Sequence, residues 1–271
     1  MITTVLPELP FRMKVYTVPK CLRGIFLRER PLLGDLCRVA YDVTAEFLAT
    51  HFPGVEGVPY FVCAVHTFGS DVSPHPHVHA LCSEGIRDRQ GTFHRTADDL
   101  DYSPLEELFR HAVLAMLLGN RRITEETARK LPSWTHSGFS VDCSVGAPEG
   151  DRETLHRLAC YLLKPPVALG RMTYDAGAAK VVYHGKPGAA GRDLVVCDPK
   201  EFLLRVLLHI PTCVSYYTSS DTSAHWPGFR PDTSRLPLTR PPSGGSYRTS
   251  PRSLVRYPVS LPCPRHRCTV V

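Results

Sequence analysis

A run of alternating histidines carries the clearest chemical signal in this sequence. His75, His77 and His79 lie two residues apart in the segment SPHPHVHAL, residues 73–81. On a β-strand, side chains with this spacing share one face. Because neutral imidazoles are common ligands of divalent cations, the pair His77 and His79 predicts a metal site.

Two kinds of site fit this run. One is a His-hydrophobe-His metal site, in which His77 and His79 hold a cation against a phosphate. The other is the site of a histidine-triad nucleotide hydrolase, which needs no metal and uses a histidine nucleophile. Its pattern of three alternating histidines followed by two hydrophobic residues is met by residues 75–81. In the first case His66 is a third candidate metal ligand. A hairpin that turns at residues 69–74 places it opposite His77, although a register slip of one residue would turn it away.

A second chemical signal is a tyrosine between two cations. Residues 151–164 have the pattern of an amphipathic helix, ended by two prolines. Its apolar stripe consists of Leu155, Leu158, Ala159 and Leu162. Arg157, Tyr161 and Lys164 share the exposed face. Positive charge beside a tyrosine favours the phenolate and holds an anion, so this face suits attack on a phosphodiester. The pattern equally fits a surface tyrosine stacked on Arg157.

The elements that must position these residues alternate along the chain. Strands are predicted at residues 13–18, 59–68, 75–82, 137–145, 180–183 and 193–197, and helices at 32–52, 103–119, 151–164 and 198–209. Ser103 is expected to cap the second helix, with Glu106 completing a capping box. The short spacings favour antiparallel hairpins. We therefore expect an α+β fold, with an antiparallel sheet flanked by helices.

The net charge of +6 is confined to the end of the chain. Residues 219–271 contain eight arginines, two aspartates, no lysine and nine of the 25 prolines. Residues 1–218 hold 24 basic and 24 acidic residues, so the charge gives this part no general affinity for nucleic acid. We expect a domain over residues 1–218 and an irregular, disordered or frameshifted tail over residues 219–271.

The sequence shows no pattern of a targeting signal. No stretch approaches the roughly 20 apolar residues of a membrane span, and the N-terminus lacks the pattern of a signal peptide. None of the ten cysteines forms a CxxC pair, which favours reduced thiols. We therefore expect a cytoplasmic protein with no membrane partner. The sequence does not give its oligomeric state.

Several motifs together resemble one family. The segments VYTVPKCLRGIF, LLGDLCR, VHTFGSDVSPHPHVHAL, SPLEELFRHAVL, LACYLLKPP, VVYHGKPG and DPKEFLLRVLLHIP occur in its order and spacing. A His-hydrophobe-His strand followed by a Tyr-x-x-Lys helix is the two-part signature of HUH endonucleases. Over roughly residues 10–217, the chain resembles the rolling-circle transposases of the insertion-sequence-91 type.

This resemblance implies a function for each signal. His77 and His79 correspond to the family's metal-binding pair, Tyr161 to its nucleophile and Lys164 to the cation that follows. The implied reaction nicks single-stranded DNA at element ends, leaves a 5′-phosphotyrosine and a 3′-hydroxyl, and rejoins strands by its reversal. Mg²⁺ or Mn²⁺ is the implied cofactor. Arg157 and Lys164 are the expected DNA contacts of the catalytic face.

The chain departs from the family pattern in four ways. Arg157 stands where better-known members have a second tyrosine, so the chain resembles the single-tyrosine subgroup. His66 stands where glutamine is usual. The family's cysteine-rich zinc-binding module is expected to be missing. The likeness ends after Tyr216 and Tyr217, and the tail that follows is hypothesised to be a frameshifted remnant. An inactive DNA-binding remnant of a mobile element stays an alternative, beside the histidine-triad hydrolase.

Overall fold

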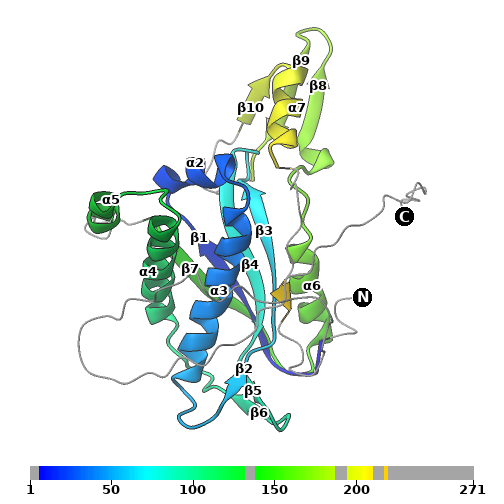
Figure 1. The fold of residues 1–271 in the computed structure, drawn as a ribbon. Coiled ribbons are helices and arrows are strands. Elements are labelled where there is room, and N and C mark those ends of the chain that lie inside the picture. The colour runs from blue at the N-terminus through cyan, green and yellow to red at the C-terminus, as the bar shows by residue number, and fades with distance from the viewer. Residues whose placement is uncertain (1–5, 132–137, 187–193, 210–216, 219–271) are drawn as a thin grey trace, which may run out of the picture.

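The computed structural model describes residues 6–131, 138–186, 194–209 and 217–218, and its centre is a five-stranded sheet (Figure 1). The strand order is β11-β3-β4-β1-β7, and every neighbouring pair is antiparallel. The strands are β1 Phe11–Thr17, β3 Phe61–Phe68, β4 Pro74–Ser83, β7 Ser140–Ala147 and β11 Tyr217–Thr218. Helices lie on both faces of this sheet, so the α+β fold is confirmed. The tail, residues 219–271, lies outside the described residues.

Three helices cover one face and build the main core. They are α2 Lys20–Arg28, α3 Leu32–Ala49 and α4 Ser103–Gly119. Their apolar stripes meet the inward side chains of the sheet, such as Tyr16 of β1 and Phe61 of β3, both almost fully buried. The hydroxyl groups of Tyr16 and Thr44 form a hydrogen bond inside this core, so these two buried polar groups are paired.

One helix, α6 Arg152–Leu162, covers the opposite face. Asp151 caps it by accepting a hydrogen bond from the Thr154 amide at 2.9 Å. The predicted apolar stripe packs on the sheet, where Leu155, Ala159 and Leu162 join a smaller core. Among the described elements, α6 lies over β4 and beside the strands that carry the histidines.

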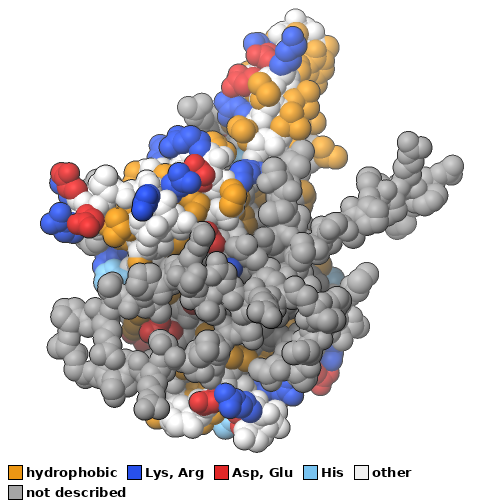
Figure 2. Space-filling model, viewed as in Figure 1, with side chains coloured by type: hydrophobic (Ala, Val, Ile, Leu, Met, Phe, Trp, Pro, Cys, Tyr) orange, Lys and Arg blue, Asp and Glu red, His pale blue; other side chains and the backbone are white. Residues whose placement is uncertain are grey.

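A small lobe projects from the body after α6 (Figure 1). It consists of the short helix η2 Leu169–Arg171, the strands β8 Met172–Asp175, β9 Lys180–His184 and β10 Leu194–Cys197, and α7 Pro199–Leu207. The hairpin of β9 and β10 was predicted and is confirmed, whereas β8 was not expected. Buried Tyr183 and Phe202 lie in its core. Hydrophobic side chains gather along one edge of the lobe (Figure 2).

The remaining described elements are short. A three-stranded sheet is formed by β2 Gly57–Val58, β5 Gly85–Asp88 and β6 Phe93–Arg95, and α5 Glu125–Lys130 follows α4. Within the described residues, no helix is long and apolar enough to cross a membrane.

The predicted end of one helix and the predicted cap of another were wrong. The helix expected at 32–52 ends at Ala49, where the Thr50 hydroxyl donates to the Phe47 carbonyl oxygen at 2.6 Å. Ser103 is the first residue of α4 rather than its cap, and no side chain caps this helix. Instead, the carboxylate of Asp101 accepts hydrogen bonds from the amide and hydroxyl of Ser103.

Two further expectations fail near the sheet's second face. The strand predicted at 137–145 is not regular: a bulge in β7, between the pairs Met13–Val145 and Val15–Asp142, breaks the two-residue alternation of buried side chains, and Val145 is 49% exposed. The helix expected at 151–164 ends at Leu162, so Lys164 lies just beyond it.

Candidate functional site

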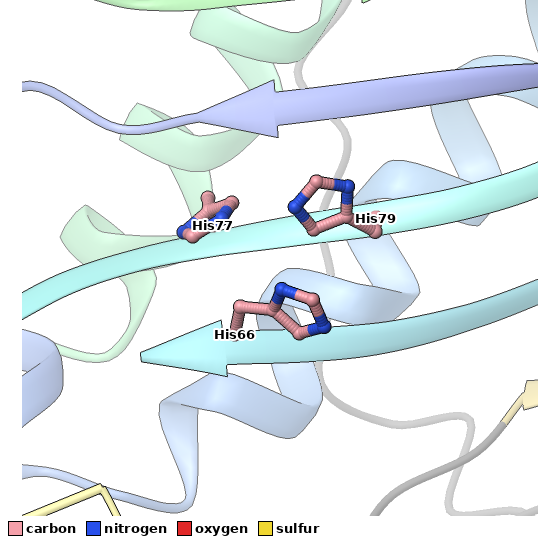
Figure 3. Close-up of side chains that lie close together, drawn as sticks. All are labelled: His66, His77 and His79. Atoms are coloured by element: carbon pink, nitrogen blue, oxygen red, sulfur yellow. The ribbon is translucent and has the colours of Figure 1, made fainter. Parts of the chain in front are cut away.

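The predicted hairpin register brings three histidines together. β3 and β4 pair with His66 opposite His77, as expected, and His79 follows on the same face (Figure 3). The ring centroid of His66 lies 5.4 Å from that of His77 and 4.3 Å from that of His79. One ring nitrogen from each residue lies within 4.8 Å of the others. An ion bound at about 2.1 Å to each nitrogen spans up to about 4.2 Å between ligands, so small ring rotations suffice.

Hydrogen bonds orient two of these rings. Nε2 of His66 donates to the carbonyl oxygen of Leu162 at 3.0 Å, and Nδ1 of His77 donates to that of His75 at 2.6 Å. Since a carbonyl oxygen only accepts, the lone pairs are left on Nδ1 of His66 and Nε2 of His77. This arrangement is typical of metal-ligating histidines. Nδ1 of His79 is buried and has no hydrogen-bond partner within the described structure. These residues therefore fit a divalent cation.

The three imidazoles are also held in the neutral form. Burial, followed by the charges of neighbouring groups, lowers the pKa of His77 to about 3 and that of His79 to about 2. The pKa of His66 is lowered as well, chiefly by burial. Neutral histidines can bind a cation without first losing a proton. His75 lies beside His77, 5.0 Å between ring centroids, but outside the three-histidine group.

Tyr161 lies at the edge of the histidine cluster. Its ring centroid is 5.1 Å from that of His79, and its side chain is 43% exposed. The position follows from the packing of α6 on β4, because burial of Ala159 and Leu162 turns the intervening face toward the histidines and solvent. Tyr161 is thus accessible to a large substrate and adjacent to the candidate metal ligands.

The two predicted cations behave differently. Nζ of Lys164 lies 5.3 Å from the centroid of the Tyr161 ring, within the range of a cation–π contact. The side chain of Arg157 instead contacts Glu153 at 3.5 Å and donates to the Thr154 hydroxyl at 2.8 Å. The structure therefore brings together His66, His77, His79, Tyr161 and Lys164, whereas Arg157 points to acidic and hydroxyl partners on its own helix.

Two further cations near the site escaped the sequence analysis. The pKa of Lys164 is lowered by burial and by the positive charges of Arg171 and Lys186. Both residues belong to the lobe, which the sequence only partly predicted. No residue spacing signals their approach to Lys164, since it depends on how β8 and β9 pair.

Comparisons with known proteins identify the family of this chain. Residues 61–215 match the family described as "Putative transposase", so the chain belongs to that family. The match begins with β3 and includes the histidine cluster, Tyr161 and the lobe.

A curated relative gives a more particular likeness. The chain is 28% identical over 224 residues to the "Transposase for insertion sequence element IS801" of Pseudomonas savastanoi pv. phaseolicola. The alignment covers 76% of this chain and 52% of the relative, so the chain spans about half the relative's length. No solved structure matches.

Proposed function

We propose that this chain is the catalytic part of an HUH-type, rolling-circle transposase of the insertion-sequence-91 kind. It would nick and rejoin single-stranded DNA at element ends through a 5′-phosphotyrosine. The observation that carries the proposal is the 5.1 Å separation between the rings of exposed Tyr161 and His79. A nucleophile beside a histidine cluster suits phosphoryl transfer better than either feature alone.

His66, His77 and His79 would hold the divalent cation, Mg²⁺ or Mn²⁺. Imidazole ligands suit Mn²⁺ better than Mg²⁺. When bound, the ion supplies Lewis-acid stabilisation to the scissile phosphate. The buried, unpartnered Nδ1 of His79 supports this assignment.

The chain's own residues account for the covalent steps. The Tyr161 oxygen attacks phosphorus after its proton leaves to solvent, and the bond from phosphorus to the 3′ oxygen breaks. That oxygen takes up a proton and becomes a free 3′-hydroxyl. Lys164 favours the phenolate and attracts the phosphodiester anion. Attack of a 3′-hydroxyl on the phosphotyrosine is the reverse of this reaction: it releases Tyr161 and joins two DNA strands. Arg157 would contact DNA after its exposed ion pair with Glu153 is broken.

A covalent-adduct assay tests the proposal. The full chain is incubated with Mn²⁺ and single-stranded oligonucleotides from the DNA flanking its gene, then separated on a denaturing gel. We expect an adduct that is lost in Tyr161→Phe and kept in the control Tyr174→Phe, an exposed tyrosine on β8. An adduct that survives Tyr161→Phe overturns the assignment.

The same assay separates the alternatives. With nucleotide conjugates added as a second substrate, release of AMP through a phosphohistidine, without a DNA adduct, identifies a histidine-triad hydrolase. DNA binding with neither activity identifies an inactive remnant.

A further inference from the structure

Three cations lie around the base of the lobe, and one of them, Lys164, is next to Tyr161. β8 and β9 are antiparallel, with Met172 opposite Tyr183, so the residue before β8 and the residues after β9 lie at the same end. These are Arg171 and Lys186. Lys164, on the connection from α6, is close enough for their charges to act on it. We call Lys164, Arg171 and Lys186 the lobe-base cation site.

Arg171 is fixed in place by a buried partner. Its Nη2 donates to the hydroxyl oxygen of Tyr183 at 2.9 Å, and its Cζ lies 5.1 Å from the centroid of that ring. Tyr183 is fully buried and also accepts a hydrogen bond from the Ala168 amide at 3.2 Å. Nη1 reaches the Ser70 carbonyl oxygen, at 3.5 Å, in the turn between β3 and β4. A guanidinium held in this way is oriented before any ligand arrives, and several of its N–H donors remain for one.

The three cations of this site are not neutralised by ion pairs within the part of the chain that the structure describes. Within the described residues, none of them forms an ion pair, whereas Arg152, Arg157 and Arg205 each pair with a glutamate. Like charges held near one another repel, and a bound anion relieves this repulsion. The cluster is therefore built for an anionic ligand rather than for internal ion pairs.

The position of the cluster indicates which anion. Nζ of Lys164 is 5.3 Å from the centroid of the Tyr161 ring, and Arg171 contacts the turn that leads into the histidine strand. A DNA strand whose scissile phosphate lies at Tyr161 would bring a neighbouring phosphate toward these cations. We propose that the lobe-base cation site binds backbone phosphates of the single-stranded DNA, next to the phosphate that is cleaved. This inference rests on the proposed function.

Binding measurements on the full chain test this role. A labelled single-stranded oligonucleotide is titrated by fluorescence anisotropy at several salt concentrations, in a Tyr161→Phe background that prevents cleavage. Lys186→Gln, an exposed substitution, should weaken binding about 5–10-fold and reduce the magnitude of the slope of log K against log salt by about 0.7. Arg171→Gln should do the same.

Lys200→Gln is the matched control. Lys200 is exposed and lies in the same lobe, but at the start of α7, the end nearest Cys197 and away from the base. It should change neither the affinity nor the slope. The inference is overturned if both Lys186→Gln and Arg171→Gln behave like this control.

Two further measurements distinguish strand binding from free-anion binding and from the cleavage reaction itself. Millimolar inorganic phosphate should leave oligonucleotide binding almost unchanged at matched ionic strength; efficient displacement would overturn a strand-binding role in favour of a free-anion site. Adduct formation by the wild-type chain is measured separately. If the wild-type chain forms the adduct but Lys186→Gln and Arg171→Gln bind the oligonucleotide normally, this inference fails and the proposed function stands. If no adduct forms but the two variants weaken salt-sensitive binding, the proposed function fails and the binding site stands.

Discussion

Nε2 of His66 donates a hydrogen bond to the carbonyl oxygen of Leu162 at 3.0 Å, which ties the histidine cluster to the residue after Tyr161. The last carbonyl groups of a helix have no partners within the helix, so the bond satisfies one of them. It also fixes which nitrogen of His66 is available to a cation. One side chain thus sets both the ligand geometry and the position of the tyrosine helix.

Substitution of His66 should separate these two contributions. His66→Gln can keep the donation to Leu162 and offer its amide oxygen as a ligand, whereas His66→Ala can do neither. We expect Mn²⁺ affinity to fall roughly 10-fold in the first variant and about 100-fold or more in the second. Isothermal titration calorimetry measures both. An affinity equal to that of the wild-type chain in both variants would contradict a ligand or orienting role.

Metal should stabilise the fold through the same cluster. Mn²⁺ at 100 times its dissociation constant would add about 2.7 kcal/mol to the free energy of unfolding, and chelator should remove the gain. His77→Ala and His79→Ala should abolish the shift in melting temperature. The control is His111→Ala, which removes an exposed histidine of α4 that pairs with Glu107. Unchanged metal stabilisation in both cluster variants would refute the site.

Lys164 should act on the rate of strand cleavage. Removing its charge in Lys164→Gln should slow adduct formation about 10–100-fold, and Lys164→Arg should restore part of the rate. Because its pKa is lowered, the charge is lost at a lower pH than in an ordinary lysine. Single-turnover kinetics at saturating oligonucleotide measure the effect. A normal rate in Lys164→Gln would remove the residue from the reaction.

His209 should make the stability of the lobe dependent on pH. It is buried; Nε2 donates to the Val72 carbonyl oxygen at 3.0 Å, and Nδ1 is 3.1 Å from the Thr67 hydroxyl. Its pKa is lowered, chiefly by burial. The folded state therefore favours neutral imidazole, and the stabilisation is fully present above about pH 6.5 and lost as the pH falls toward the lower folded value.

Urea unfolding with chelator present, from about pH 5 to 8, tests this dependence. At pH 8 the free energy of unfolding of the wild-type chain should exceed that of His209→Gln by about 1–3 kcal/mol, and this difference should shrink as the pH falls toward about 5. His111→Gln serves as the exposed control. A difference that grows as the pH falls would contradict the assignment.

Local patterns in the sequence predicted the hairpin that carries the histidines, the apolar stripe of α6 and the fold class. These depend on periods of two and 3.6 residues, which one segment reveals by itself. The helix 20–28, the strand β8 and the bulge that exposes Val145 were missed. Each depends on contacts between distant segments, as does the approach of Arg171 to Lys164. The partner of Arg157 could not be predicted either, because a shared helix face does not determine that its side chain contacts Glu153.

The turn between β3 and β4 has a consequence for how this fold can vary. Arg171 contacts Ser70 in this turn, and His209 contacts Val72 in the turn and Thr67 near the end of β3, so the lobe is attached to the loop that joins the two histidine strands. The opposite end of the lobe, between Asp175 and Lys180, is remote from that attachment. Insertions at this tip should be tolerated without moving the histidines, whereas a change of one residue in the turn would shift the metal ligands and the lobe together.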